Sequence, residues 1–205
     1  MEKGLLITLE GGEGSGKSTQ LEYIKNWFTK RNIPFIVTRE PGGTDLGNEV
    51  RNILKHAKYE ITPRSELLLF NACRAELIDE VIKPALLNGI NVICDRFYDS
   101  TVAYQSFGRG LDAEQVMDIC MYATNQIEPD ITFWLDIEPS IAFARKHGAD
   151  LNDRLEQSGL EFHNNVYKGY KYLHKNYPRI KRIDATLTID EVSAKINEIL
   201  AEKFE

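Results

Sequence analysis

The glycines, lysine and hydroxyl residues of EGGEGSGKST, residues 10–19, have the spacing of a turn that binds phosphate. Glycines let a backbone turn tightly and direct several N–H groups at an anion. Lys17 would bring a charge to the β- and γ-phosphates of a nucleotide, and the Ser18 hydroxyl could bind Mg²⁺. An apolar run precedes the turn, and the positive end of the following helix would face the same phosphates. We therefore expect nucleotide binding by the turn residues Gly11, Gly12, Glu13, Gly14, Ser15, Gly16, Lys17, Ser18 and Thr19.

A second pair of reactive residues, Asp95 and Arg96, ends the apolar run in INVICDRFYDS, residues 90–100. Asp95 is placed to hold Mg²⁺, through water, beside the glycine-rich turn. Arg96 offers a planar fork that suits a phosphate group. Motor ATPases carry a water-activating carboxylate at this place, and GTPases carry an Asn-Lys-x-Asp motif that this chain lacks. A cation here favours transfer to a negatively charged acceptor over hydrolysis, and a simple ion pair at the strand end is the structural alternative.

Two further segments carry candidate ligand-binding residues. TREPGGTDLGNEVR, residues 38–51, contains a tight turn and two cations, Arg39 and Arg51, which could face an anion or be solvated. In LLLFNACRAEL, residues 67–77, Phe70 and Arg74 are four residues apart and share a helix face. An aromatic ring beside a guanidinium could stack on a flat base and donate hydrogen bonds to its carbonyls, although Phe70 alone would be typical of a core.

The elements that must position these residues alternate between strand and helix. Apolar runs predict strands over 5–10, 33–39, 90–95, 130–136 and 179–184. Helical patterns cover 17–30, 44–56, 65–88, 113–125, 158–176 and 189–203, with Pro84 expected to kink or divide the third of these. This alternation predicts an α/β fold with a five-stranded parallel sheet and helices on both faces.

Composition limits the partners of the chain. Its 205 residues are enough for one sizeable core, so we expect one domain over 1–205. A net charge of −6 argues against general binding to nucleic acid or to a membrane surface, and neither the N-terminus nor a later run has the length of a membrane span. The three cysteines lack the spacing of a metal site. We expect a cytoplasmic protein without disulfides.

Together these motifs give the chain a family resemblance. EGGEGSGKST, TREPGGT, LLLFNACR, CDRFYDSTVAYQ and DRLE occur in order along the sequence, and in them the chain resembles the bacterial thymidylate (dTMP) kinases. The resemblance implies the P-loop kinase fold and ATP-dependent, Mg²⁺-dependent phosphorylation of dTMP to dTDP. It also implies a homodimer.

The family's site residues carry over onto matching positions of this sequence. Catalytic roles would fall to Lys17, Arg96, Glu13, Asp95, Arg145 and Lys146, and Mg²⁺ would be held by Ser18 and Asp95. ATP would contact the glycine-rich turn together with Arg145, Asp184 and Ala185. The residues for dTMP would be Glu13, Arg39, Arg51, Phe70, Arg74, Arg96, Thr101, Tyr104 and Gln105. Phe70 would stack on thymine, Arg74 and Gln105 would bind its polar edge, and Tyr104 would lie against the deoxyribose.

The P-loop of this chain has no cation between its two outer glycines, where some family members carry one. The chain is therefore similar to the subgroup that supplies the charge from a lid, here about residues 145–157. Arg145, Lys146 and Arg154 are its candidate cations. His147 stands where an arginine is expected, and its charge depends on pH.

Two alternatives stay open from the sequence. A deoxynucleoside kinase acting on thymidine would need a base beside the 5′-hydroxyl and would have less use for Arg51 and Arg96. A non-catalytic nucleotide switch would bind a nucleotide tightly and turn it over very slowly.

Overall fold

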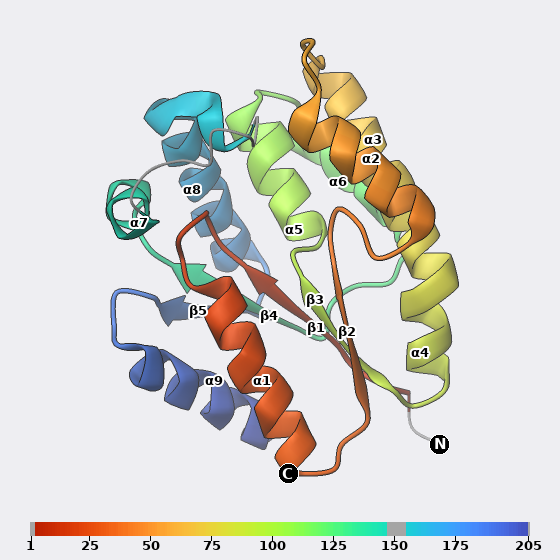
Figure 1. The fold of residues 1–205 in the computed structure, drawn as a ribbon, viewed down its shortest axis with the longest axis vertical. Helices are drawn as coiled ribbons and strands as arrows, with labels where there is room; N and C mark the ends of the chain where they lie inside the picture. Colours follow the sequence, from red (N-terminus) through yellow and green to blue (C-terminus); the bar gives the residue numbers. More distant parts are fainter. Residues whose placement is uncertain (1–2, 147–154, 205) are drawn as a thin grey trace.

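The computed structural model describes residues 3–146 and 155–204, which form an α/β fold around one parallel sheet (Figure 1). The strands are β1 (Leu6–Glu10), β2 (Phe35–Arg39), β3 (Asn91–Asp95), β4 (Ile131–Asp136) and β5 (Ile180–Asp184), in the order β2-β3-β1-β4-β5. Every pairing is parallel. The predicted fold class and five-stranded parallel sheet are confirmed.

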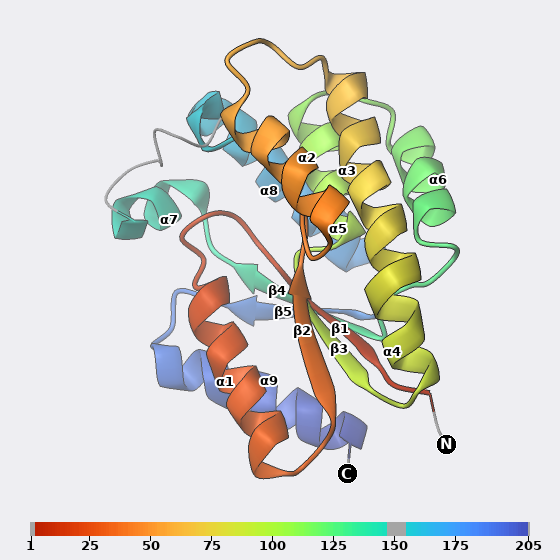
Figure 2. The same ribbon diagram turned by 45° about the vertical axis from the view of Figure 1, so that its right-hand side comes forward.

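Helices cover both faces of the sheet (Figures 1 and 2). α1 (Lys17–Lys30) and α9 (Ile189–Phe204) lie together on one face. On the other side are α2 (Asp45–His56), α3 (Pro63–Leu77), α4 (Lys83–Leu87), α5 (Tyr98–Thr101), α6 (Ala113–Ala123) and α8 (Gly159–Asn176). α7 (Pro139–Lys146) follows β4, and a short 3₁₀ turn, η3 (Glu156–Ser158), precedes α8.

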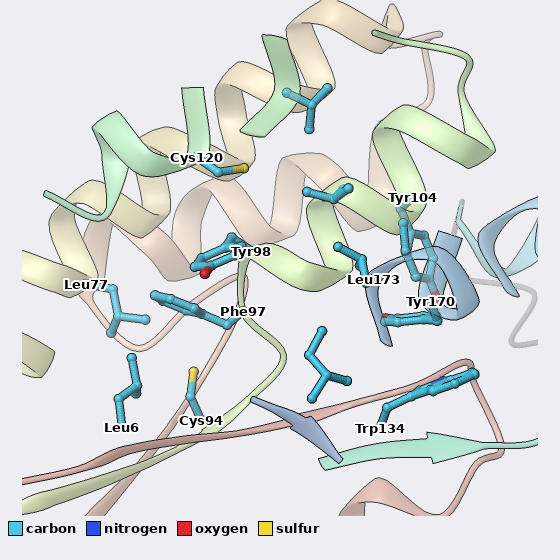
Figure 3. Packing of buried hydrophobic residues seen from close by; sticks show 14 of the residues in the cluster. Leu6, Leu77, Cys94, Phe97, Tyr98, Tyr104, Cys120, Trp134, Tyr170 and Leu173 are labelled. Carbon is cyan, nitrogen blue, oxygen red and sulfur yellow. The ribbon is translucent and has the colours of Figure 1, made fainter. Parts of the chain in front are cut away.

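Successive residues of the central strands enter two separate cores. Leu6 of β1 belongs to a cluster with Cys94, Phe97, Trp134 and residues of α3, α4, α5, α6 and α8, part of which Figure 3 shows. Its neighbour Ile7 belongs to the cluster that packs α1 and α9 on the opposite face. Both faces of the sheet are therefore buried, which explains why the central strands appear in the sequence as continuous apolar runs.

The predicted helix over 65–88 is divided next to Pro84, as expected, but by a π-helical turn that the sequence did not predict. A π-helical turn, η1 (Ile78–Ile82), separates α3 from α4, and the Lys83 N–H donates to the Ile78 carbonyl five residues earlier. Pro84 has no N–H, and its ring would clash with the carbonyl of Glu80, so the wider turn accommodates it. The sequence also failed to predict α7 and the segment formed by α5 and a second π-helix, η2 (Val102–Gly108).

The carboxyl ends of β1, β2 and β3 lead into the segments that carry the predicted site residues. In open parallel sheets, ligands bind at this edge, where the strand order reverses. Within the described residues, no helix is both long and apolar enough to cross a membrane.

Candidate active site

A cavity of about 600 Å³ opens at the carboxyl edge of the sheet. It brings together most of the predicted site residues, namely Glu13, Gly14, Gly16, Lys17, Ser18, Thr19, Arg39, Arg51, Phe70, Arg74, Asp95, Arg96, Thr101, Tyr104, Gln105 and Arg145. The same wall contains residues that the sequence analysis did not single out: Glu40, Pro41, Leu54, Lys55, Phe97, Ser100, Leu155 and His163. Cations from α1, β2, α2, α3, α7 and the end of β3 thus surround one space in a chain of net negative charge.

Some predicted residues lie elsewhere. Gly11, Gly12, Ser15, Asp184 and Ala185 do not line this cavity. Lys146 ends α7, and its side chain is not among those described. His147 and Arg154 fall outside the described residues, so the predicted lid is described only at its ends.

The glycine-rich turn depends on backbone that only glycine adopts easily. Gly16 caps α1 with φ +93°, in the left-handed region. A Cβ on Gly14 would lie 2.4 Å from the Ala142 carbonyl oxygen of α7, so a side chain there would displace that helix. The turn therefore keeps its N–H groups close to the start of α1, where an anion binds.

Lys17 is buried inside this turn. Its Nζ donates to the carbonyl oxygens of Gly11 at 3.1 Å and Gly12 at 2.9 Å. Burial, and secondly the positive charge of Arg96, lowers the pKa of Lys17 to about 8. Its charge is thus held only by neutral oxygens and nearby carboxylates, and a phosphate would stabilise it further.

Asp95 and Ser18 both line the cavity and could hold a magnesium ion. Among the described residues, none donates a hydrogen bond to the buried Oδ1 of Asp95. No group of three or more His, Cys, Asp or Glu side chains with metal-binding geometry occurs in that part of the chain. Mg²⁺ commonly takes one or two protein carboxylates and completes its shell with phosphate oxygens and water. One carboxylate and one hydroxyl, from Asp95 and Ser18, fit this way of binding Mg²⁺.

Arg96 is aimed into the cavity by an unusual backbone. It has φ +69°, which is uncommon for a residue with a side chain. Its Nη2 forms an ion pair with Glu13 at 2.6 Å, and its Nη1 donates to Ser100 Oγ at 3.0 Å and to the Tyr170 hydroxyl at 3.3 Å. Four contacts from separate elements, including Tyr104 at 3.4 Å, fix this guanidinium.

Behind Arg96 lies a buried carboxylate that the sequence analysis missed. Glu10, at the end of β1, accepts hydrogen bonds from the Ser100 hydroxyl at 2.5 Å and the Tyr170 hydroxyl at 3.0 Å. It also accepts from the Phe97 N–H at 2.7 Å. Burial, and then the charge of Asp99, raises the pKa of Glu10 to about 7. Figure 3 shows Tyr170 between Tyr104 and Trp134, so this support is packed into the core.

Arg74 lies at the bottom of the cavity, 1% exposed, and is paired with Glu40. The remaining acceptors around its guanidinium are Asn71 Oδ1 at 3.0 Å, Thr101 Oγ1 at 2.9 Å and Cys120 Sγ at 3.5 Å. All five N–H groups of a guanidinium therefore have an acceptor in the protein. A ligand would reach this group only by sharing an N–H, or through the Thr101 hydroxyl that Arg74 holds.

Two other predicted cations rest on backbone carbonyls. Arg51 donates to the carbonyl of Pro41 at 2.7 Å, which ties α2 to the loop after β2. Arg145 donates to the carbonyls of Ala185 at 2.6 Å and Thr186 at 3.1 Å. The start of the predicted lid and the loop after β5 are therefore in direct contact.

A glycine-rich phosphate turn between β1 and α1, an Asp-Arg pair after β3 and a cation-lined cavity between them define the P-loop kinase class. The thymidylate kinase family model matches residues 9–196. A thymidylate kinase of Gloeobacter violaceus is 45% identical over 195 residues, which cover 94% of this chain and 92% of the relative. One from Synechococcus sp. (strain JA-3-3Ab) is 48% identical, with 94% and 93% covered, and one from Chlorobium luteolum is 43% identical, with 98% of each covered. The chain belongs to the thymidylate kinase family.

Proposed function

We propose that this protein transfers the γ-phosphoryl group of ATP to dTMP, giving dTDP and ADP. The observation that carries the proposal is the single cavity in which a phosphate-binding turn faces a second cluster of cations, with a buried polar wall beyond them. The matched family and its named members support the same activity. With this activity the protein is a transferase of dTTP synthesis.

The ATP half of the cavity contains the glycine-rich turn, Lys17 and Arg145. Backbone N–H groups of the turn and the buried ammonium of Lys17 bind the phosphates. Arg145 and the loop at Asp184 and Ala185 border the adenosine. Ser18 and Asp95 would hold Mg²⁺, which would neutralise part of the phosphate charge.

The dTMP half contains Arg39, Arg51 and Arg96 around the acceptor phosphate, and Phe70 beside the base. Arg74, Thr101 and Gln105 form the polar wall at the base edge, and Tyr104 borders the sugar. Because the acceptor is already an oxyanion, the reaction needs no general base. The obstacle is repulsion between two phosphate groups, which Lys17 and Arg96 offset while they hold the groups in line.

We also propose a homodimer and a cytoplasmic location. Leu68 of α3, Leu87 of α4 and Tyr122 of α6 are exposed apolar side chains on helices that lie on the same side of the molecule (Figures 1 and 2). An isologous contact of such a face would bury them. Cys73, Cys94 and Cys120 are buried free thiols, as expected in a reducing compartment. Sedimentation equilibrium should give twice the chain mass of 23.4 kDa, and a mass of one chain would contradict the dimer.

The test of the activity is ADP release from ATP and Mg²⁺ with different acceptors. The panel contains dTMP, dUMP, thymidine, dCMP and AMP, with a sample without acceptor as background. We expect strong release with dTMP, weaker release with dUMP, and little with the others, because the thymine methyl alone is worth only about 1–3 kcal/mol. Turnover of thymidine but not dTMP would indicate a nucleoside kinase. Release without acceptor would indicate a hydrolase.

A further inference from the structure

One wall of the cavity contains a buried carboxylate that contacts a predicted base-binding residue but lies behind it. Glu66 of α3 is fully buried. Its Oε1 accepts a hydrogen bond from the Gln105 Nε2 at 2.9 Å. Gln105 belongs to η2 and lines the cavity, whereas Glu66 does not. Glu66 therefore acts on the cavity through Gln105.

Arg109 forms an ion pair with Glu66. Its Nε donates to Glu66 Oε1 at 3.1 Å and its Nη2 to Oε2 at 3.4 Å, while the guanidinium lies over the Phe162 ring. A carboxylate that pairs with a guanidinium through both oxygens serves as a hydrogen-bond acceptor. The amide nitrogen of Gln105 must therefore face Glu66, and its Oε1 must point away. The chemistry of the pair fixes an amide orientation that would otherwise be ambiguous.

The Gln105 Oε1 atom receives no hydrogen bond from the described residues. The side chain is 1% exposed and borders the cavity, so this oxygen is available there as an acceptor. One helical turn earlier, Thr101 Oγ1 accepts from Arg74 at 2.9 Å, which leaves its hydroxyl proton to donate. The wall thus offers a donor beside an acceptor.

That polarity matches one edge of a pyrimidine. Thymine and uracil present a carbonyl oxygen next to an N–H, whereas cytosine presents an amino group next to a bare ring nitrogen. We propose that Glu66 is a positioning residue for base selection: it holds the Gln105 amide with its oxygen toward the cavity, so that bases with an imide N–H are accepted and cytosine is rejected. This inference rests on the proposed kinase function.

The test is Glu66→Gln, which keeps the side-chain shape and lets the new amide donate to Gln105. The Gln105 amide can then turn over and present its NH₂ group to the base. We expect the ratio of kcat/KM for dTMP to that for dCMP to fall by about tenfold or more, because a mismatched buried polar pair discriminates strongly. The KM for ATP should stay within about twofold. An unchanged ratio would overturn the inference.

Two further variants separate positioning from general structural damage. Gln105→Met removes the amide, and Glu66→Gln should have no further effect on the ratio in that background, because Glu66 acts through Gln105. Additive losses would overturn the inference. Arg109→Lys is the matched control, since it keeps a positive charge beside Glu66 and should leave the ratio as it is.

A measurement on the unaltered protein covers the case in which Glu66→Gln does not fold. The protein should bind dTMP about tenfold or more tightly than dTMP methylated at N3, which lacks the imide proton. Equal affinities would overturn the inference. The two proposals fail differently: turnover of dTMP without preference over dCMP would overturn the inference alone, while absence of dTMP turnover would overturn the proposed function and the inference with it.

Discussion

The two halves of the cavity hold their polar groups by different means. In the dTMP half, Arg74 is paired with Glu40, Arg96 with Glu13, and the Gln105 amide donates to Glu66. In the ATP half, Lys17 and Arg145 donate to main-chain carbonyls of the glycine-rich turn and of the loop after β5. Carboxylates hold these three groups of the dTMP half, in which Arg51 alone of the groups described above donates to a carbonyl, and neutral carbonyls hold the two cations of the ATP half.

The difference has an energetic consequence. A cation that donates to an ionised acceptor gains the attraction between two full charges, which a neutral carbonyl does not offer. The ATP-side cations bind neutral oxygens, so they can exchange these for phosphate oxygens at a net gain. On the dTMP side, Arg74, Arg96 and Gln105 keep their carboxylate partners and present a fixed surface to the ligand. The structure thus combines a pre-formed pocket for dTMP, the phosphate acceptor, with an ATP site whose cations exchange carbonyl oxygens for phosphate oxygens when ATP binds.

The largest effect should follow from Lys17→Ala. The ammonium would be lost from the transferred phosphates, and we expect kcat/KM for ATP to fall by about 10²–10³-fold or more. Because its direct hydrogen-bond partners are neutral carbonyls, the free energy of unfolding should change little. Steady-state kinetics and urea unfolding check both points, with Lys25→Ala on the exposed face of α1 as the control. A loss confined to stability would contradict the assigned role.

Arg74→Met should mainly affect folding. It leaves Glu40 buried without its guanidinium, and we expect the free energy of unfolding to fall by about 3–5 kcal/mol. Removing the second charge as well, in Arg74→Met with Glu40→Leu, should recover a large part of that loss. Urea unfolding followed by circular dichroism measures both variants. If the single variant lost less than about 1 kcal/mol, the dTMP half would not depend on this pair.

Glu10 predicts a pH dependence of stability. Its pKa is raised from 4.5 to about 7, so between these values the folded protein keeps a proton that the unfolded chain has released. The stabilisation is full below pH 4.5 and is lost by about pH 7, which amounts to about 3 kcal/mol. Glu10→Gln resembles the protonated carboxyl and lacks this dependence. As the pH rises from 5 to 8, the unfolding free energy of the variant should therefore increase relative to that of the parent. A difference between the two that does not depend on pH would contradict the prediction.

Arg145→Ala should have the smallest effect. The side chain is exposed and holds two carbonyls of the loop after β5, so we expect a rise of about threefold to tenfold in KM for ATP. The KM for dTMP should not change. Exposed Lys168→Ala on α8 is the matched control. A larger rise in KM for dTMP than for ATP would place Arg145 in the dTMP half and contradict its assignment to the ATP half.

The sequence predicted the sheet well because its strands are buried on both faces. Each expected strand ends at the observed residue and begins one or two residues early. The predicted helix over 17–30 has the observed bounds, since a phosphate turn marks its start. The segment 98–108 was missed because it is rich in aromatic and β-branched residues and continues from α5 into a π-helix, which has no 3.6-residue period.

The cavity could be predicted from its cations but not from the carboxylates that hold them. Lys17 and Arg96 belong to local motifs, so their types and spacing are visible along the chain. Glu10, Glu40 and Glu66 are single acidic residues whose partners lie 34 or more positions away, the shortest separation being that of Glu40 and Arg74. Such pairs form only in the folded chain. A lone acidic residue at the end of an apolar strand, as in LITLE, is the one local sign.

The most direct test of the pre-formed acceptor pocket is calorimetric titration of dTMP into the protein, with and without a non-hydrolysable ATP analogue and Mg²⁺. If the carboxylate-held groups are in place before ATP binds, dTMP should bind to the ATP-free protein, and the analogue should change its Kd by less than about threefold. If dTMP bound only in the presence of the analogue, the dTMP half would form only after ATP binds, and the pre-formed pocket would be contradicted.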